Sequence, residues 1–257
     1  MSQNLQKFQS NIDAISSLKA PKGVMFDWDN TLVDSWPLIQ MAIDKTMVAM
    51  NREPWGLEKV RDEVHKSMRE SFPIIFGENW EKAGEIYTEC YRANHLQKML
   101  LLPNAKEFIE LLASKNILQF VVSNKMGNSL RKEVKNMKLD HLFFAIIGAC
   151  DAIADKPSKY PAELALLGCD LNPKQDLIWF IGDTIADIEC AVNAGCQPIL
   201  YCDNIDKISK TIPEKMLTSD NFIDDFFSFG SNEDNYFLKK LPLIIGYNSL
   251  INLISSI

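Results

Sequence analysis

The chain has 257 residues, of which 47% are hydrophobic and 24% charged, the composition of an ordinary folded protein. That length suits one large α/β domain, or a main domain with a smaller companion. A net charge of −7, from 27 basic and 34 acidic residues, favours solubility and disfavours nucleic acid and anionic membranes as partners. Three histidines and six cysteines without C-x-x-C spacing offer little to a zinc site.

The same composition predicts a cytoplasmic protein. The cysteines are expected to be small buried residues of a reduced chain. The first 20 residues lack the basic flank, apolar run and cleavage site of a signal peptide. No apolar stretch approaches the roughly 20 residues needed to span a bilayer. The nearest, residues 241–257, is interrupted by Pro242 and Gly246 and is expected to form a strand followed by a helix.

The first predicted strand is a short apolar run at Gly23–Phe26. A long helical block follows it, and from Trp36 to about Leu101 no convincing strand is found. The helical patterns cover residues 38–50, 57–71 and 80–99, with breaks at 51–54 and 72–77. A block of this size is expected to form a separate cap over residues 36–101. The alternative is that these helices pack directly on the sheet.

Strands and helices alternate in the next part of the chain. Apolar runs predict strands at residues 118–122, 143–147, 177–181 and 198–201, and helical spacing predicts helices at 104–114, 129–137 and 161–167. Strands that are apolar throughout and alternate with helices predict an α/β fold with a parallel, Rossmann-like sheet and helices on both faces. The core domain would comprise residues 1–35 and 102–257. Residues 218–235, acidic and rich in Ser and Asn, are expected to form a surface loop.

Two aspartates, Asp27 and Asp29, follow the first predicted strand directly. In an open α/β sheet, ligands bind at the carboxyl ends of the strands, so both carboxylates are expected at a binding site. Carboxylates spaced in this way can attack an electrophile, move a proton or hold a divalent cation. The alternative is an acidic turn, because Asp and Asn are common turn residues.

Two further polar signals follow in chain order. Ser123 and Asn124 end the second strand, where a hydroxyl and the following amides can hold phosphate oxygens. Lys156 precedes Pro157, which is expected to open a helix, and its charge suits a phosphate or a carboxylate. Taken singly, each residue could equally be an ordinary solvated side chain.

The last signal is Gly-Asp at the end of a buried strand, followed four residues later by a second aspartate. Asp183 and Asp187 would stand between this strand and the helix that follows it. Such an arrangement suits Mg²⁺, which takes one or two carboxylates together with waters and substrate oxygens. Helix capping would account for either aspartate alone but not for the whole set of signals.

Taken in order, these four signals resemble the motifs of the haloacid dehalogenase superfamily. The chain matches D-x-D-x-T at Asp27, a hydrophobic strand ending in Ser123, a lysine before a helix at Lys156, and G-D-x-x-x-D at Gly182. The resemblance spans roughly residues 23–201. It implies a core of that superfamily with a small helical cap inserted between the first and second motifs.

The resemblance also implies a phosphatase in which Asp27 is the nucleophile and forms an aspartyl-phosphate that water hydrolyses. Asp29 would protonate the leaving oxygen and later activate that water. Dehalogenases of this superfamily lack an aspartate at this position, because the departure of halide needs no general acid. Asp29 therefore favours cleavage of a phosphate ester.

The remaining site residues follow from the same resemblance. Lys156 would bind the phosphoryl group and screen the negative charge of the cluster. The residues implied in phosphate binding or in supporting that loop geometry are Thr31, Ser123, Asn124 and Lys156. The residues implied in holding Mg²⁺ are Asp27, Asp29 through its backbone carbonyl, Asp183 and Asp187, the last in direct contact or one shell further out.

The cap's size and place are similar to those of the phosphoglycolate phosphatase and β-phosphoglucomutase groups. We therefore expect a small phosphorylated metabolite, similar to phosphoglycolate, as the substrate. His65, Lys66 and Arg69 are candidates for contact with an anionic substrate, or are solvated helix residues. Residues 64–70 lack the glycine that often opens the cap's substrate loop, which leaves specificity open. The aromatic residues of the cap are expected to form its small core.

Other functions are compatible with part of this pattern. Within the superfamily, the alternatives are a sugar-phosphate mutase and a pyrophosphatase. A non-catalytic phosphoacceptor or regulatory module also combines acids, Ser or Thr, and Lys on an α/β sheet, and a partner-binding protein could keep the fold alone. Asp29 and the cap argue against a regulatory module. The oligomeric state does not follow from the sequence.

Overall fold

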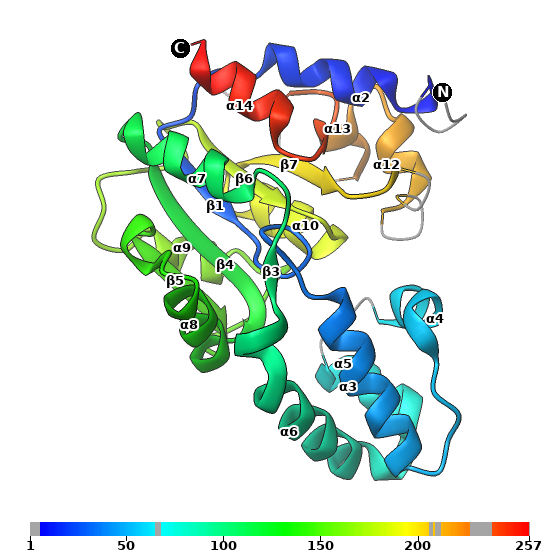
Figure 1. Ribbon diagram of the computed structural model, residues 1–257. Coiled ribbons are helices and arrows are strands. Elements are labelled where there is room, and N and C mark those ends of the chain that lie inside the picture. The colour runs from blue at the N-terminus through cyan, green and yellow to red at the C-terminus, as the bar shows by residue number, and fades with distance from the viewer. Residues whose placement is uncertain (1–5, 65–67, 206–207, 209–211, 227–237, 257) are drawn as a thin grey trace.

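The computed structural model describes residues 6–64, 68–205, 208, 212–226 and 238–256. At its centre is a six-stranded parallel sheet in the order β5–β4–β1–β6–β7–β8 (Figure 1). The strands are β1 (Gly23–Phe26), β4 (Leu118–Met126), β5 (Ala145–Ala149), β6 (Ile178–Gly182), β7 (Gln197–Cys202) and β8 (Leu243–Ile245). The five strands predicted between residues 23 and 201 are therefore present, with ends shifted by up to a few residues.

Helices cover both faces of this sheet. Successive side chains of β1 point in opposite directions, so Val24 and Phe26 join one hydrophobic cluster and Met25 joins another. The helices that cover the two faces are α7 (Ala105–Ser114), α8 (Gly127–Asn136) and α14 (Asn248–Ser255) on the first, and α9 (Tyr160–Ala165) and α10 (Ile185–Asn193) on the second. Burial on both sides explains why the strands are apolar throughout, and the predicted α/β fold is confirmed.

Short segments from both ends of the chain extend the second face. Phe8, Leu217 and Phe222 pack with residues of α10, β7 and β8 in a further hydrophobic cluster. The helices nearby are α2 (Gln9–Asp13), α12 (Glu214–Thr218) and α13 (Phe222–Phe226). The strand and helix expected within residues 241–257 are β8 and α14, and Figure 1 shows α14 on the same side of the molecule as α2.

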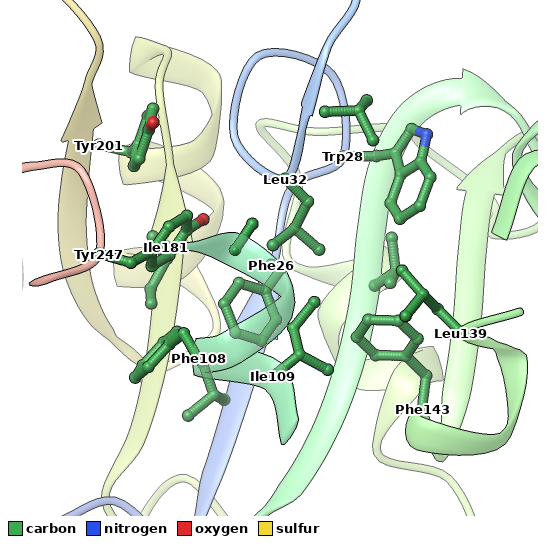
Figure 2. Close-up of a cluster of buried hydrophobic side chains, with 14 of the residues drawn as sticks. Phe26, Trp28, Leu32, Phe108, Ile109, Leu139, Phe143, Ile181, Tyr201 and Tyr247 are labelled. Carbon is green, nitrogen blue, oxygen red and sulfur yellow. The ribbon is translucent and has the colours of Figure 1, made fainter. Parts of the chain in front are cut away.

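Tyr247 connects this C-terminal segment to the loop after β1. Its ring is stacked on Phe108 with ring centroids 5.2 Å apart, and it lies 5.2 Å from Tyr201 (Figure 2). Its hydroxyl donates a 2.8 Å hydrogen bond to the backbone carbonyl of Thr31. Both residues are fully buried. The C-terminal tail thus supports the loop that carries the first acidic motif.

Four helices between β2 (Val33–Asp34) and β3 (Leu100–Leu101) have a hydrophobic cluster of their own. The helices are α3 (Trp36–Ala49), α4 (Gly56–Glu63), α5 (Met68–Phe76) and α6 (Trp80–Lys98). The chain leaves and re-enters the core through β2 and β3, which pair antiparallel. Figure 1 shows these helices grouped beyond one end of the strands. The separate cluster supports our proposal of a cap at residues 36–101 and a core at 1–35 and 102–257.

The cap differs from the sequence prediction in three details. The single helix predicted at residues 57–71 is divided, since α4 ends at Glu63 and α5 begins at Met68. The predicted break at 72–77 is wrong over residues 72–76, because α5 continues to Phe76 with Pro73 inside it, but a break follows at Gly77, where a short 3-10 helix begins. Phe72 and Phe76 lie one turn apart and are both buried, and their packing outweighs the cost of the proline. The two residues of β3 were too few to give a strand signal.

Two differences concern the segments that carry site residues. β4 continues to Met126, four residues beyond the predicted end, after a shift in its pairing with β5. Pro157 opens no helix; α9 begins at Tyr160 and has Pro161 in its first turn. Lys156 therefore lies in a loop before the helix.

The expectations drawn from composition hold in part. Four cysteines are buried as expected, but Cys169 is half-buried and Cys150 is exposed. Cys150 lies just beyond β5, in a turn where its φ is 66°. Among the described residues, no helix is both long enough and apolar enough to cross a membrane.

The contact of Tyr247 with Thr31 gives a stability prediction. Tyr247→Phe keeps the ring packing but leaves the buried Thr31 carbonyl without its partner, and we expect unfolding free energy to fall by about 1–3 kcal/mol. Urea denaturation followed by circular dichroism measures the change. Tyr160→Phe, at a side chain that is 41% exposed, is the control and should change little. Equal midpoints for wild type and Tyr247→Phe would contradict this prediction.

Candidate active site

A buried lysine joins two aspartates at the carboxyl end of the sheet. The Nζ atom of Lys156 lies 2.5 Å from Oδ1 of Asp27 and 2.5 Å from Oδ1 of Asp187. It also donates a 2.9 Å hydrogen bond to the carbonyl of Val122. These three ionic side chains are at least 90% buried. Residues that are 129 and 31 positions apart in the sequence thus meet around one ammonium group.

The carboxylates of Asp27 and Asp187 are positioned by the neighbouring strands β1 and β6. Asp27 follows β1, and its amide donates to the carbonyl of Ile181 on β6 at 2.9 Å. Asp187 lies in the first turn of α10, where its Oδ2 accepts hydrogen bonds from the amide and hydroxyl of Thr184 at 2.9 and 2.6 Å. A Cβ at Gly182 would lie 2.3 Å from the Cβ of Asp187, so only glycine allows the helix to approach β6 this closely.

Asn124 holds the backbone of Lys156 through two hydrogen bonds. Its Nδ2 donates to the Lys156 carbonyl and its Oδ1 accepts from the Lys156 amide, both at 2.9 Å. This pair of bonds fixes the loop from which the ammonium reaches the aspartates. Ser123, one residue earlier, is 4% exposed and lines the adjoining cavity. Direct contact of Asn124 or Ser123 with phosphate stays a prediction.

Three carboxylates form a group that could hold a metal ion. Asp27, Asp183 and Asp187 each offer an oxygen, and these atoms all lie within 4.8 Å of one another. The hydroxyl of Thr31 donates to Oδ1 of Asp183 at 3.3 Å, which orients that side chain. Both oxygens of Asp187 already accept hydrogen bonds, from Lys156 and Thr184. Asp27 and Asp183 are therefore the freer ligands of the three.

Burial makes this concentration of negative charge costly. Burial raises the pKa of Asp27 to about 7, although Lys156 acts in the opposite direction, and the charge of Asp187 adds to the rise. Burial also raises the pKa of Asp183 well above its usual range, together with the charges of Asp187 and Asp27. Burial acts against the charge of Lys156, but Asp187 and Asp27 raise its pKa and keep it an ammonium. One lysine cannot offset three carboxylates, so a hard divalent cation fits the donor set.

Asp29 has different surroundings from Asp27. Its Oδ1 accepts a 2.7 Å hydrogen bond from Lys125, and its side chain is 27% exposed. Its side-chain oxygens are not among those gathered with Asp27, Asp183 and Asp187. The structure thus brings Asp29 to the same cavity but separates its carboxylate from the three clustered ones.

The cavity has a volume of about 510 Å³ and is lined by residues of both the cap and the core. From the core it receives Asp27, Asp29, Ser123, Lys156 and Asp183. From the cap it receives mostly apolar side chains, among them Trp36, Ile39, Ile43, Phe72 and Tyr87. The cap aromatics are thus partly core, as expected, and partly cavity wall. Of the predicted cap contacts, His65, Lys66 and the side chain of Arg69 lie outside the described residues.

The sequence interpretation missed two buried charged residues, Lys125 and Glu133. Nζ of Lys125 lies 2.8 Å from Oε2 of Glu133, and the two side chains are 6% and 1% exposed. Glu133 is flanked on its helix by Leu130 and Val134, which belong to the core. An acid on the apolar face of a helix was the signal available in the sequence.

The fold and this site define a class of protein: a doubly wound α/β protein whose acids and lysine converge at the carboxyl ends of parallel strands. The family model for haloacid dehalogenase-like hydrolases matches residues 24–201. The chain belongs to this family.

Two curated relatives illustrate the similarity. A phosphoglycolate phosphatase of Aquifex aeolicus is 29% identical over 199 residues, which cover 76% of this chain and 91% of the relative. A phosphoglycolate phosphatase of Pseudomonas putida is 26% identical over 187 residues, or 69% of this chain and 68% of the relative. Each of these alignments covers more than two thirds of this chain, and the family model at residues 24–201 spans the motifs from Asp27 to Asp187.

Solved structures agree with this assignment. A haloacid dehalogenase superfamily hydrolase from Ehrlichia chaffeensis is 26% identical with a TM-score of 0.57, and the match covers 93% of this chain and 98% of that one. The match thus includes much of the tail beyond residue 203. A predicted phosphoglycolate phosphatase from Haemophilus somnus has a TM-score of 0.64 at 24% identity over 72% of this chain and 86% of that one, which shows the shared fold.

The group of Asp27, Asp183 and Asp187 predicts that Mg²⁺ stabilises the folded protein. We expect Mg²⁺ to raise the melting temperature, because it offsets buried carboxylate charge; at about 100 times its Kd the gain is about 2.7 kcal/mol. Asp183→Asn should abolish most of this rise. Differential scanning fluorimetry, with NaCl at matched ionic strength, measures it. Asp170→Asn, at an exposed site, is the matched control, and an unchanged Mg²⁺ response in Asp183→Asn would contradict the assignment.

Proposed function

We propose that this chain is a Mg²⁺-dependent phosphatase that hydrolyses a small phosphomonoester through an aspartyl-phosphate on Asp27. The observation that carries the proposal is the buried ammonium of Lys156, 2.5 Å from both Asp27 and Asp187 beside a cavity. A carboxylate and the anionic phosphate that it attacks repel each other, and a nearby positive charge such as this ammonium offsets that repulsion. The family match and the curated relatives support the same chemistry.

In the first step, an oxygen of Asp27 attacks phosphorus and the bond between phosphorus and the ester oxygen breaks. Asp29 gives its proton to the leaving oxygen. In the second step, Asp29 takes a proton from a water molecule that attacks the aspartyl-phosphate, which releases phosphate and restores Asp27. The separate surroundings of the two aspartates support this division of labour, because Asp29 faces the cavity but contacts Lys125 instead of Lys156.

The other site residues orient the phosphoryl group and offset its charge. Lys156 pairs with Asp27 and stands beside the phosphoryl oxygens, and the hydroxyl of Ser123 contacts one of them. Mg²⁺ would be held by Asp27, Asp183 and the backbone carbonyl of Asp29, and would supply positive charge that offsets the charge of the phosphoryl group. Asp187 keeps Lys156 in place through the hydrogen bonds that already engage both of its oxygens.

The cavity guides the choice of substrates. Phosphoglycolate is the first to test, because two curated relatives carry its name. A cavity of about 510 Å³ also admits larger phosphomonoesters, and its mostly apolar cap wall suits an organic leaving group. A panel should therefore add sugar phosphates and nucleotides, scored by kcat/KM. The cytoplasmic location stays a prediction.

The decisive variant is Asp27→Asn. We expect Mg²⁺-dependent release of phosphate from p-nitrophenyl phosphate and phosphoglycolate to fall at least about a thousandfold, because the variant lacks the nucleophile. A malachite green assay measures phosphate release. Asp170→Asn, which makes the same chemical change at an exposed site, should keep wild-type activity. Turnover that survives in Asp27→Asn, or a wild type inert on the whole panel, would refute the proposal.

A further inference from the structure

A second buried polar cluster adjoins the carboxylate of Asp29. Nζ of Lys125 lies 2.7 Å from Oδ1 of Asp29 and 2.8 Å from Oε2 of Glu133, and donates to the hydroxyl of Tyr91 at 2.6 Å. Burial acts against the charge of Lys125, but Asp29 and Glu133 raise its pKa. The lysine is therefore a cation shared between two carboxylates.

Glu133 is the anchor of this cluster. Its Oε2 also accepts a 2.8 Å hydrogen bond from the indole of Trp28, and its Oε1 lies 2.6 Å from Nδ1 of His95. It is 1% exposed and is not part of the cavity wall, whereas Lys125 is. Glu133 can therefore affect a substrate only through the groups that it holds.

The cluster also ties the cap to the core. Tyr91 and His95 lie on the cap helix α6, whereas Glu133 is on α8 of the core. Nδ2 of Asn136, also on α8, donates to the carbonyl of Leu96 on α6 at 2.8 Å. The position of the cap helix α6 therefore affects the contacts that hold Lys125, because Tyr91 and His95 are part of the same cluster.

Stability alone explains this arrangement poorly. Taking charges out of water is unfavourable for each ion, and a buried ion pair often contributes no more than an apolar pair would. The cluster reaches the reaction site through the contact of Lys125 with Asp29. In the proposed function, Asp29 is the residue that exchanges a proton with the substrate. A group of this kind must keep a defined position for efficient proton transfer.

We propose that Glu133 is a positioning residue for the phosphatase reaction: it holds Lys125, and through Lys125 sets the place of the Asp29 carboxylate. This inference rests on the proposed function. Glutamine at position 133 can still accept from Trp28 and donate to His95, but it lacks the charge. Lys125 would then have Asp29 as its one carboxylate partner in this cluster and would hold it away from the leaving oxygen.

The test compares two esters that differ in their need for a proton. p-Nitrophenolate leaves as a stable anion, whereas the alkoxide of an alkyl phosphate needs the proton of Asp29. We expect Glu133→Gln to lower kcat/KM for an alkyl phosphate at least about tenfold, and kcat/KM for p-nitrophenyl phosphate less than about threefold, because kcat/KM covers only the steps up to departure of the leaving group. Glu110→Gln, at an exposed pair with Lys106, is the matched control and should change neither rate.

Lys125→Met provides an independent check if Glu133→Gln folds poorly. It should show the same preference for p-nitrophenyl phosphate, and the double variant should be no slower on the alkyl phosphate than Lys125→Met alone. Equal losses on both esters, or additive effects in the double variant, would overturn the positioning role. A wild type that releases phosphate from neither ester overturns the proposed function instead, and this inference with it.

Discussion

The site is organised around one buried cation, the ammonium of Lys156. Parallel strands β1 and β6 are neighbours, so the carboxylates that follow them necessarily lie close together and repel. Lys156 offsets this repulsion by pairing with Asp27 and Asp187, while Asn124 fixes its backbone. Breaking a buried pair of this kind typically costs about 3–5 kcal/mol. The same contacts therefore stabilise the carboxyl ends of these strands and place a positive charge where a phosphate would bind.

A second lysine gives the two aspartates of the first motif different environments. Asp27 is paired with Lys156 and lies among the clustered carboxylates, whereas Asp29 is paired with Lys125 and lies outside them. Two carboxylates only two residues apart can take different roles when their surroundings differ in this way. The sequence alone shows two similar acids; the two lysines, 31 residues apart, distinguish them.

Much of the core could be predicted from the sequence, because parallel strands buried on both faces are short, apolar and sharply bounded. The site residues of the four motifs could be expected together, since all follow the carboxyl ends of strands. Local sequence patterns predict the structure less well where tertiary packing overrides the helix propensity of single residues. Pro73 lies inside α5 because Phe72 and Phe76 pack on one side. Glu133 depends on Trp28 and His95, which are distant in the sequence, as well as on Lys125.

The loop between β1 and β2 shows why residues far from the reaction matter. Hydrogen bonds hold it from three directions: the amide of Asp27 to β6, the indole of Trp28 to Glu133, and the carbonyl of Thr31 to Tyr247. Phosphoryl transfer depends mainly on positioning and electrostatics, so small displacements of this loop would misplace both aspartates. Through Tyr247, the described part of the tail beyond residue 203 fixes the carbonyl two residues after Asp29. This contact supports the loop, and a contact between residues 216 positions apart leaves no local pattern in the sequence.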